Sequence, residues 1–318
     1  MTRILSCALA ALIATSALSP AVAAEAQTAG VTSAQIAKAA RGRIPAFVAC
    51  LGKEGVSVVG GHRGGPSAGY PENALATYKR SVAAAPMWVE GDIQITKDGV
   101  LVLNHDTTLD RTSTGKGEIR NHTWAELQSV RLKDPQGSVT EHGLVKFADW
   151  LAWADGKAIL QVDTKPATGD DKVVAAVKAA KAEDRVVYVT YTIDQARNVM
   201  RLSPGAVVSV PVRNRQDLEA AKAAGVFGPQ VVAMVLPVAG DPDFYRDVAA
   251  TGSPMVDLGI MWGEEAPDKR YKGLADASLY QTRQIHSQIV PSDHPLQAVE
   301  ALSADPGYRA KLAACGVR

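Results

Sequence analysis

Four short clusters in the sequence combine residues whose chemistry is complementary. They are His62-Arg63-Gly64, Glu90-Gly91-Asp92, His105-Asp106 and Asp163-Thr164-Lys165. Carboxylates offer only oxygen as a ligand, which suits Ca²⁺ or Mg²⁺ better than zinc. Imidazoles titrate near neutrality and move protons, while arginine and lysine bind phosphoryl oxygens. If the four clusters meet in space, they predict a site for an anionic substrate and a hard divalent cation.

The carboxylates are the expected ligands of this metal ion. Glu90, Asp92 and Asp163 would repel one another when crowded together, unless a cation neutralised their charge. Glu90 and Asp92 are two residues apart, and such a pair points to one face of a strand. A lone Glu-x-Asp pair is more often part of a solvated face. The metal hypothesis therefore depends on the convergence of all four clusters.

The expected catalytic residues are His62 and His105. One histidine would take a proton from the nucleophile and the other would give one to the leaving alkoxide, and the sequence leaves open which does which. Arg63 and Lys165 are expected to bind the phosphoryl oxygens. The remaining histidines of the mature chain are predicted to lie on the surface or to be structural, and they are His122, His142, His286 and His294.

Alternating apolar runs and helical patterns must position these clusters. The predicted strands are Val56–Gly61, Trp88–Ile95, Ala158–Asp163, Val186–Thr190, Val207–Pro211, Val231–Pro237, Met255–Ile260 and Gln288–Pro291. The predicted helices between them include Glu72–Ala84, Asp170–Asp184, Ile193–Leu202, Arg215–Ala224 and Pro242–Ala250. This alternation favours an α/β fold of the (β/α)8 TIM-barrel type over a doubly wound sheet. In a barrel, the carboxyl ends of the strands converge on one mouth, where the clusters are expected.

A small β-hairpin insertion is predicted after the second strand. Asp98-Gly99 separates two β-type runs, Trp88–Ile95 and Val100–Asn104, and Asp-Gly is a strong signal for a hairpin turn. Counting back from a turn at Asp98-Gly99, His105 comes opposite Asp92. The hairpin would therefore carry an imidazole to the predicted metal ligands.

Residues 1–24 have the pattern of a cleavable signal peptide. Arg3 precedes an apolar run from Ile4 to Leu18, and the small residues Ala21 to Ala24 follow. The run is too short for a stable transmembrane span, and no later segment has about 18 uninterrupted apolar residues. We expect a secreted or periplasmic protein without stable membrane insertion, in which residues 25–318 form a single barrel domain.

An N-terminal helix is predicted to run from Ser33, its expected N-cap, to about Leu51, with Gly52 as its stop. Cys50 lies at the end of this helix and Cys315 lies in the final helix. Because both cysteines would enter an oxidising compartment, a Cys50–Cys315 disulfide is favoured over two buried thiols. The bridge would join the two ends of the mature chain.

The composition excludes some classes of partner. The chain has 318 residues, of which 47% are hydrophobic and 21% charged, and its formal net charge is +1. This balance gives no electrostatic reason to expect nucleic acid or an anionic membrane as the main partner. Aromatic residues make up 5% of the chain, too few for a base-stacking platform. We expect a small-molecule substrate.

Two stretches of the sequence resemble the glycerophosphodiester phosphodiesterase family. They are GGHRGGPSAGYPENALATY and VEGDIQITKDGVLVLNHDTTLDRTSTGKGEI. The shared pattern is His-Arg-Gly, a Pro-Glu-Asn turn, Glu-x-Asp, an Asp-Gly hairpin and His-Asp, in this order across the first half of the mature chain. The later segment IVPSDHP is similar to the closing strand of the family.

The resemblance implies a (β/α)8 barrel that uses Ca²⁺ or Mg²⁺ to hydrolyse glycerophosphodiesters to glycerol 3-phosphate and an alcohol. By position, it implies that His62 and His105 are the acid–base pair. It implies metal binding by Glu90 and Asp92, and phosphate binding by Arg63 and Lys165. Glu72 and Asn73, in the Pro-Glu-Asn turn, would contact the site residues without binding the metal themselves. Glu72 also fits the first turn of a helix. The family commonly has Glu-x-Lys where this chain has Asp163-Thr164-Lys165, so one carboxylate arm is shorter. Met261-Trp262-Gly263-Glu264 poorly matches an aromatic segment of the family, so the leaving-group pocket can differ.

Three other functions share some of these features. A phospholipase-type barrel acting on intact lipid, or forming a cyclic phosphate, would carry an exposed apolar loop, for which Gly259-Ile260-Met261-Trp262 is a small candidate. A glycosidase also uses paired carboxylates, but it would not need the two histidines, Arg63 and Lys165, and it would be indifferent to EDTA. A periplasmic binding protein would bind glycerophosphodiesters without turnover.

Overall fold

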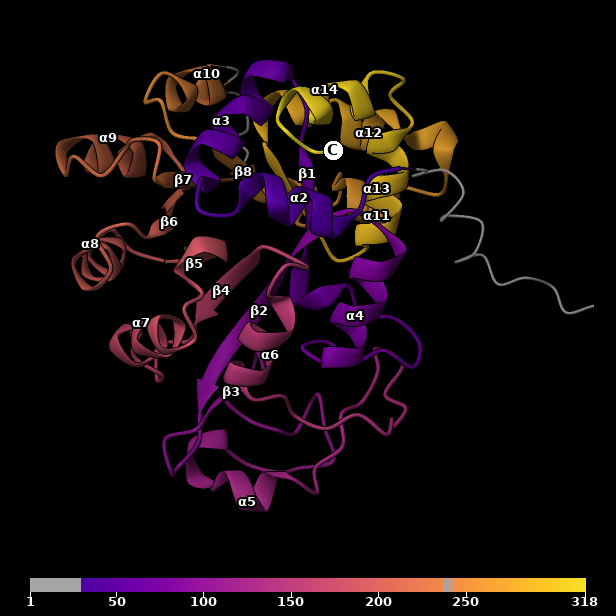
Figure 1. Ribbon diagram of the computed structural model, residues 1–318, viewed down its shortest axis with the longest axis vertical. Coiled ribbons are helices and arrows are strands. Elements are labelled where there is room, and N and C mark those ends of the chain that lie inside the picture. The colour runs from indigo at the N-terminus through magenta and orange to yellow at the C-terminus, as the bar shows by residue number, and fades with distance from the viewer. Residues whose placement is uncertain (1–29, 237–240, 242) are drawn as a thin grey trace, which may run out of the picture.

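The computed structural model describes residues 30–236, 241 and 243–318, which form a parallel β-barrel surrounded by helices (Figure 1). The strands are β1 (Val58–Gly61), β2 (Met87–Ile95), β3 (Leu101–Leu103), β4 (Leu160–Thr164), β5 (Val186–Val189), β6 (Val207–Val212), β7 (Val231–Val235), β8 (Met255–Asp257) and β9 (Ile289–Ser292). The predicted signal peptide and the predicted element boundaries at Pro237 and Pro242 lie outside the described residues.

Eight strands follow one another in the order β8-β7-β6-β5-β4-β2-β1-β9, and each pair in this path is parallel. The predicted barrel is therefore confirmed. β8 and β9 are joined by individual hydrogen bonds. The Gln288 N–H donates to the Met255 carbonyl at 3.0 Å, and the Gln288 side-chain oxygen accepts from the Met255 N–H at 2.8 Å. The Ser287 hydroxyl accepts from the Asp257 N–H at 2.9 Å, so side chains complete the ring of strands.

The helices cover the outside of the barrel, with α7, α8 and α9 along one side in Figure 1 and α4, α12 and α13 on the other. Their bounds are α2 (Ser33–Ala40), α3 (Ile44–Glu54), α4 (Leu75–Ala84), α5 (Trp124–Leu127), α6 (Phe147–Ala154), α7 (Asp170–Ala179), α8 (Ile193–Leu202), α9 (Arg215–Ala223), α10 (Phe244–Ala249), α11 (Pro267–Arg270), α12 (Ser278–Gln281), α13 (Pro295–Ser303) and α14 (Tyr308–Ala314). None of the described helices is long and apolar enough to cross a bilayer.

Strand residues alternate between the helical layer and the barrel interior. In β7, Ala233 and Val235 pack against Phe244 and Val248 of α10, whereas Met234 faces the interior. The alternation follows from the two-residue period of a strand. Both faces are buried because helices cover the outside and the barrel encloses the inside, which explains why these strands are continuous apolar runs.

The predicted hairpin is present, but its register differs by one residue. β3 pairs antiparallel with β2, and the Asn104 N–H donates to the Asp92 carbonyl at 2.9 Å. Asn104, not His105, therefore lies opposite Asp92. The loop holds three residues, 97–99, instead of two, and Gly99 takes the left-handed conformation with φ of 83°. After β3 the chain forms an insertion containing α5, which projects from one end of the molecule in Figure 1.

The N-terminal helix was predicted as one element, and the structure corrects this. Two helices, α2 and α3, are separated at Gly42, whose φ of 68° is not helical, and Pro45 lies in the first turn of α3. Thr32 is the N-cap of α2, whereas the Ser33 hydroxyl donates to the Ala85 carbonyl at 2.9 Å. The predicted stop at Gly52 is also wrong. α3 continues to Glu54, and the left-handed residue that caps it is Gly55.

Two further helix boundaries differ from the prediction by three residues or more. α4 begins at Leu75, so Glu72 lies in the preceding turn and is not in a helix. α7 ends at Ala179 instead of Asp184, because Lys181 adopts a φ of 50° and a short 3-10 turn follows at Glu183–Arg185.

The predicted disulfide is present. Cys50 in α3 and Cys315, directly after α14, are bonded across 265 positions of sequence. α3 and α14 pack against each other, so the bridge joins elements that are already neighbours.

Candidate active site

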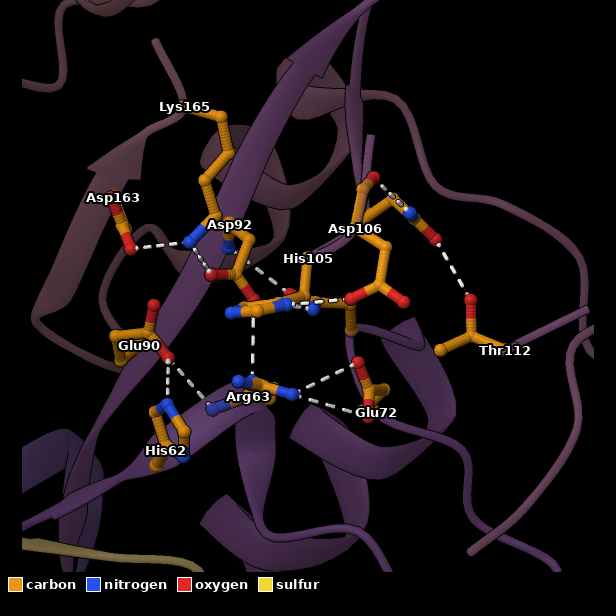
Figure 2. Close-up of polar contacts among 12 residues, drawn as sticks. His62, Arg63, Glu72, Glu90, Asp92, His105, Asp106, Thr112, Asp163 and Lys165 are labelled. Carbon is orange, nitrogen blue, oxygen red and sulfur yellow. Dashed lines mark hydrogen bonds and ion pairs between the residues drawn. The ribbon is translucent and has the colours of Figure 1, made fainter. Parts of the chain in front are cut away.

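Three carboxylates converge at the carboxyl ends of β2 and β4. Asp92 of β2 pairs directly with Asp163 of β4, and Glu90 lies two residues before Asp92 on the same face. One oxygen of each carboxylate lies within 4.8 Å of the others, and all three side chains are buried (Figure 2). The parallel pairing of two adjacent strands is thus what gathers Glu90, Asp92 and Asp163.

Positive side chains surround the carboxylates. The Lys165 ammonium lies 2.6 Å from Oδ1 of Asp92 and 2.7 Å from Oδ2 of Asp163. Burial alone would raise the pKa of Asp92, but the charges of Lys165 and Arg63 outweigh it, so the pKa lies below its usual value. Among the described residues, no lysine or arginine forms an ion pair with Glu90, whose nearest cationic partner is His62 at 4.0 Å. Burial, together with repulsion from Asp92, raises the pKa of Glu90 to about 8.

The donor set fits a hard divalent cation. Oδ1 of Asp163 is buried and has no hydrogen-bond partner among the described residues. An unsatisfied buried carboxylate oxygen is unfavourable, and coordination to a cation would satisfy it. Glu90, Asp92 and Asp163 offer oxygen atoms only, which Ca²⁺ and Mg²⁺ prefer. These three residues therefore have the positions, burial and chemistry of a metal site.

His62 lies beside the carboxylates, in the turn that follows β1. Its Nδ1 is 2.6 Å from Oδ1 of Asp293, and its Nε2 is 4.0 Å from Oε2 of Glu90. Burial lowers the pKa of His62, but the hydrogen bond to Asp293 and the negative charges of Asp293 and Glu90 raise it further than burial lowers it. The net effect favours an imidazole that is protonated at a higher pH than usual.

His105 follows the hairpin and belongs to a second hydrogen-bonded group. Its Nδ1 is 2.7 Å from Oδ1 of Asp106. Arg111 donates to Asp106 from Nε at 2.7 Å and to both oxygens of Glu72 at 2.9 Å. Glu72 in turn accepts from Arg63 at 3.3 Å. Figure 2 shows His105 on the hairpin side of the carboxylates, so the two histidines approach the cluster from different elements.

Arg63 and Asn73 hold the site through unusual backbone conformations. Both take positive φ, 50° and 59°, which side-chain-bearing residues adopt rarely and mainly where the surrounding structure enforces it. In this conformation the Arg63 N–H donates to Glu90 at 2.8 Å. The Asn73 amide donates to Oδ2 of Asp92 at 2.7 Å, and the Tyr78 hydroxyl donates to the Asn73 side-chain oxygen at 3.0 Å. Asn73 therefore orients a carboxylate.

The four clusters named from the sequence are thus brought together, and each remaining histidine contacts other parts of the molecule. His122 bonds the Lys116 carbonyl, His142 stacks on Tyr70 and His286 stacks on Tyr245. His294 is exposed at the start of α13.

Sequence reasoning missed three residues that contact the site. Asp293 bonds His62, Arg111 links Asp106 to Glu72, and the Tyr191 hydroxyl donates to Oδ2 of Asp163 at 2.5 Å. Asp293 lies within the IVPSDHP segment, and Arg111 comes five residues after Asp106. The sequence therefore held a signal that could have marked both residues as part of the site. Tyr191 directly follows a predicted strand, and nothing else in the sequence marks it.

Comparisons with known proteins find similar sequences. The profile of the glycerophosphoryl diester phosphodiesterase family matches residues 62–231. A glycerophosphodiester phosphodiesterase of Caldanaerobacter subterraneus subsp. tengcongensis is 28% identical over 150 residues, which cover 45% of this chain and 61% of the relative. The chain thus matches about three fifths of the length of that curated relative.

Solved structures share the fold over most of this chain. A glycerophosphoryl diester phosphodiesterase from Parabacteroides distasonis has a TM-score of 0.70 and 29% identity, covering 78% of this chain and 87% of its own. An Oleispira antarctica phosphodiesterase, solved in complex with the product sn-glycerol-3-phosphate, has a TM-score of 0.61 and 19% identity over 79% of this chain and 98% of its own. With more than half of its length matched by the family profile, and with this barrel and site, the chain belongs to the glycerophosphoryl diester phosphodiesterase family.

Proposed function

We propose that this protein hydrolyses glycerophosphodiesters to glycerol 3-phosphate and an alcohol, with a divalent cation and two histidines. The observation that carries the proposal is the convergence of Glu90, Asp92 and Asp163 within 4.8 Å beside His62. Family membership supports the reaction class, and the Oleispira antarctica phosphodiesterase with its bound sn-glycerol-3-phosphate supports the product.

Glu90, Asp92 and Asp163 would hold the cation, which is Ca²⁺ or Mg²⁺ by the chemistry of the ligands. When bound, such a cation neutralises phosphodiester charge and acts as a Lewis acid. The chain itself tunes these ligands. Asn73 fixes the orientation of Asp92, and the Arg63 N–H fixes an oxygen of Glu90.

His62 and His105 would move the protons. Asp293 holds Nδ1 of His62, which leaves Nε2 directed toward Glu90 and the barrel interior. Asp106 holds Nδ1 of His105 in the same way. A carboxylate on one ring nitrogen fixes the orientation of the imidazole and leaves the other nitrogen for proton transfer. One histidine acts as the base toward the nucleophile, and the other acts as the acid toward the leaving alkoxide.

Arg63 and Lys165 would stabilise charge on the phosphoryl oxygens. An ammonium group has three N–H donors, and two of those of Lys165 are directed to Asp92 and Asp163. The third is left for a phosphoryl oxygen. Nε of Arg63 is buried without a hydrogen-bond partner among the described residues and lies 3.6 Å from Oδ2 of Asp92, so it also has donor capacity.

The test is direct hydrolysis. The mature protein is incubated with glycerophosphoethanol, glycerophosphocholine and glycerophosphoglycerol, and released glycerol 3-phosphate is measured enzymatically. We expect release that stops with EDTA and returns with excess Ca²⁺ or Mg²⁺. Turnover that persists in EDTA would contradict the role of the cation. Binding of the diesters without any product would instead fit a binding protein.

We also propose that residues 1–24 direct export and are removed. The Cys50–Cys315 disulfide supports this, because structural disulfides form and persist mainly in oxidising compartments. Expression of the full chain in a bacterial host, followed by mass determination of the periplasmic product, tests the proposal. A cytoplasmic product that retains residue 1 would contradict it.

A further inference from the structure

A cavity of about 270 Å³ opens from the candidate active site into the mouth of the barrel. Its volume corresponds to roughly nine water molecules at about 30 Å³ each. His62, Glu90 and Asp163 form one wall, so the cavity is continuous with residues assigned to proton transfer and metal binding. Whatever occupies it is attached to, or lies beside, the reacting phosphoryl group.

The two halves of this cavity differ in chemistry. β1, β2 and β4 supply the polar half described above. The opposite half is mainly apolar, and its walls come from inward-facing residues of β5 to β8, with Met261 beyond β8. Its apolar residues include Val187, Val232, Met234, Val256 and Met261. The one hydroxyl that β6 adds, on Ser209, accepts a hydrogen bond from the Thr190 N–H at 3.1 Å. Alternate strand residues face inward, so the apolar character is set by the sequence of each strand and not by one loop.

The charges on the apolar half also restrict its ligand. Among its described lining residues, only Arg213 is charged, and this guanidinium donates to Asp217 at 2.8 Å. Because this ion pair compensates the guanidinium charge and no carboxylate lines this half among the described residues, the apolar half offers no charge partner to an ammonium group. At the rim of the cavity the Trp262 side chain is 52% exposed and extends the apolar surface outward.

We propose that the apolar half binds the alcohol portion of the substrate, and that the enzyme prefers diesters whose alcohol is an uncharged hydrocarbon over choline or ethanolamine diesters. The inference rests on the proposed function. The polar half holds the phosphoryl group, and glycerol has a hydroxyl on each free carbon, so the alcohol is the part of the substrate that an apolar wall can select.

The first test is a homologous series of substrates. Initial rates are measured for sn-glycero-3-phospho-ethanol, -butanol and -hexanol under one metal concentration. We expect kcat/KM to rise roughly fourfold for each added methylene until the cavity is filled, since burial of each methylene favours binding to that extent. A kcat/KM that is the same for all three alcohols overturns the inference, while hydrolysis of all three still supports the proposed function.

A matched pair isolates charge from shape. Glycerophosphocholine is compared with the diester of 3,3-dimethylbutanol, which has the same branched shape without the charge. We expect at least a tenfold higher kcat/KM for the neutral diester. Equal rates, or a preference for choline, overturn the inference. A faster reaction with 1-acyl glycerophosphocholine than with glycerophosphocholine, together with no effect of alcohol length, would place the apolar group on the glycerol side instead.

A variant ties the preference to the cavity. Met234→Gln keeps the side-chain length but adds a polar amide, and we expect it to reduce the gain per methylene. Val139→Gln makes the same kind of change at a position that is 57% exposed and outside the cavity, and the gain should match that of the wild type. A gain that is the same in Met234→Gln and the wild type contradicts the assignment.

A binding measurement separates this inference from the proposed function. Calorimetric titration with methyl-, butyl- and hexylphosphonate, in the presence of Ca²⁺, requires no turnover. We expect affinity to rise along the series with an increasingly negative heat-capacity change, the mark of apolar burial. Rising affinity without diester hydrolysis would reject only the proposed function. Equal affinity for the three phosphonates, or no binding, would reject the apolar subsite.

Discussion

Nδ1 of His62 lies 2.6 Å from Oδ1 of Asp293, a contact between residues 231 positions apart in the sequence. His62 follows β1 and Asp293 follows β9, and these two strands are parallel neighbours. The closing strand of the barrel therefore fixes the orientation and the charge of an imidazole presented by the first strand. Because the contact leaves Nε2 directed toward Glu90, it bears directly on proton transfer.

Replacing Asp293 by asparagine removes a carboxylate whose hydrogen bond and charge help to raise the pKa of His62. Burial, the largest opposing influence, remains, so the pKa of His62 should fall. The limb of the kcat/KM profile that belongs to His62 should move to lower pH, and the imidazole should titrate at lower pH by NMR. Asp293→Glu keeps the carboxylate and should shift the pKa less. A profile and an NMR titration that are unchanged in Asp293→Asn would show that the contact does not tune His62.

The two histidines assigned to proton transfer should be far more sensitive to substitution than the others. His62→Ala and His105→Ala are each expected to lower kcat by about 10²- to 10⁴-fold, the usual contribution of general acid–base catalysis. His122→Ala, at a position whose side chain bonds the Lys116 carbonyl in the insertion, serves as the control and should keep kcat. Circular dichroism checks folding. Turnover near that of the wild type in both His62→Ala and His105→Ala would refute the assignment.

Metal binding should appear as thermal stabilisation. A ligand that binds only the folded state raises stability by about 2.7 kcal/mol at a concentration of about 100 times its Kd. Ca²⁺ or Mg²⁺ should therefore raise the Tm of the EDTA-treated wild type. In Asp163→Asn the increase should be much smaller, whereas Asp110→Asn, a change of the same kind in the insertion, should behave like the wild type. Equal increases in all three proteins would place the metal elsewhere.

Arg111 should protect the protein against acid. Its guanidinium donates to Asp106 and holds the pKa of that carboxyl well below the usual value. The folded state therefore binds fewer protons than the unfolded state near pH 4. The ion pair therefore adds to the free energy of unfolding. This stabilisation is complete above about pH 4 and is lost as pH falls through the lower pKa of Asp106 in the folded state.

The variant Arg111→Met tests this contribution. Its free energy of unfolding should be lower than that of the wild type by about 1 kcal/mol at neutral pH. The loss is small because the arginine is half exposed and solvent screens the ion pair. The difference from the wild type should shrink toward pH 2. Urea unfolding at several pH values measures both quantities, and Arg120→Met, whose ion pair with Glu118 lies on the surface of the insertion, is a matched control. A difference that does not depend on pH would exclude the Asp106 ion pair as its source.

The disulfide should contribute to stability through the unfolded chain. A bridge that closes a loop of this length restricts the unfolded state strongly, and its loss is expected to cost about 3–5 kcal/mol. The double variant Cys50→Ser, Cys315→Ser should show a lower urea midpoint than the oxidised wild type. The wild type under reducing conditions should resemble the variant. Identical midpoints for the oxidised and reduced wild type would remove the bridge as a source of stability.

The sequence predicted the barrel well because its strands carry strong local signals. Runs such as Val231–Val235 are apolar on both faces, and this pattern is typical of a strand covered on both sides. Once eight such runs alternate with helices, the topology itself brings strand ends together. The meeting of Asp92 with Asp163 could therefore be predicted without any knowledge of side-chain contacts.

Features that depend on single-residue geometry were less accessible. The predicted hairpin register is wrong by one residue because the Asp98-Gly99 pair indicates a two-residue turn, whereas the loop also includes Lys97. The contact of His62 with Asp293 could not be assigned because nothing local to either residue identifies a partner across the barrel. Lys165 was expected to face phosphate, and the structure shows that its ammonium also bridges two carboxylates.

The bond between Cys50 and Cys315 makes most of the polypeptide a covalent ring. A protease that cuts once within the insertion or in any loop between these positions would leave a single molecule, whose fragments separate only after reduction. The ring would also keep the cut barrel strands at high effective concentration. The bridged barrel would thus remain assembled after a cut that would divide an unbridged barrel into two diffusing pieces.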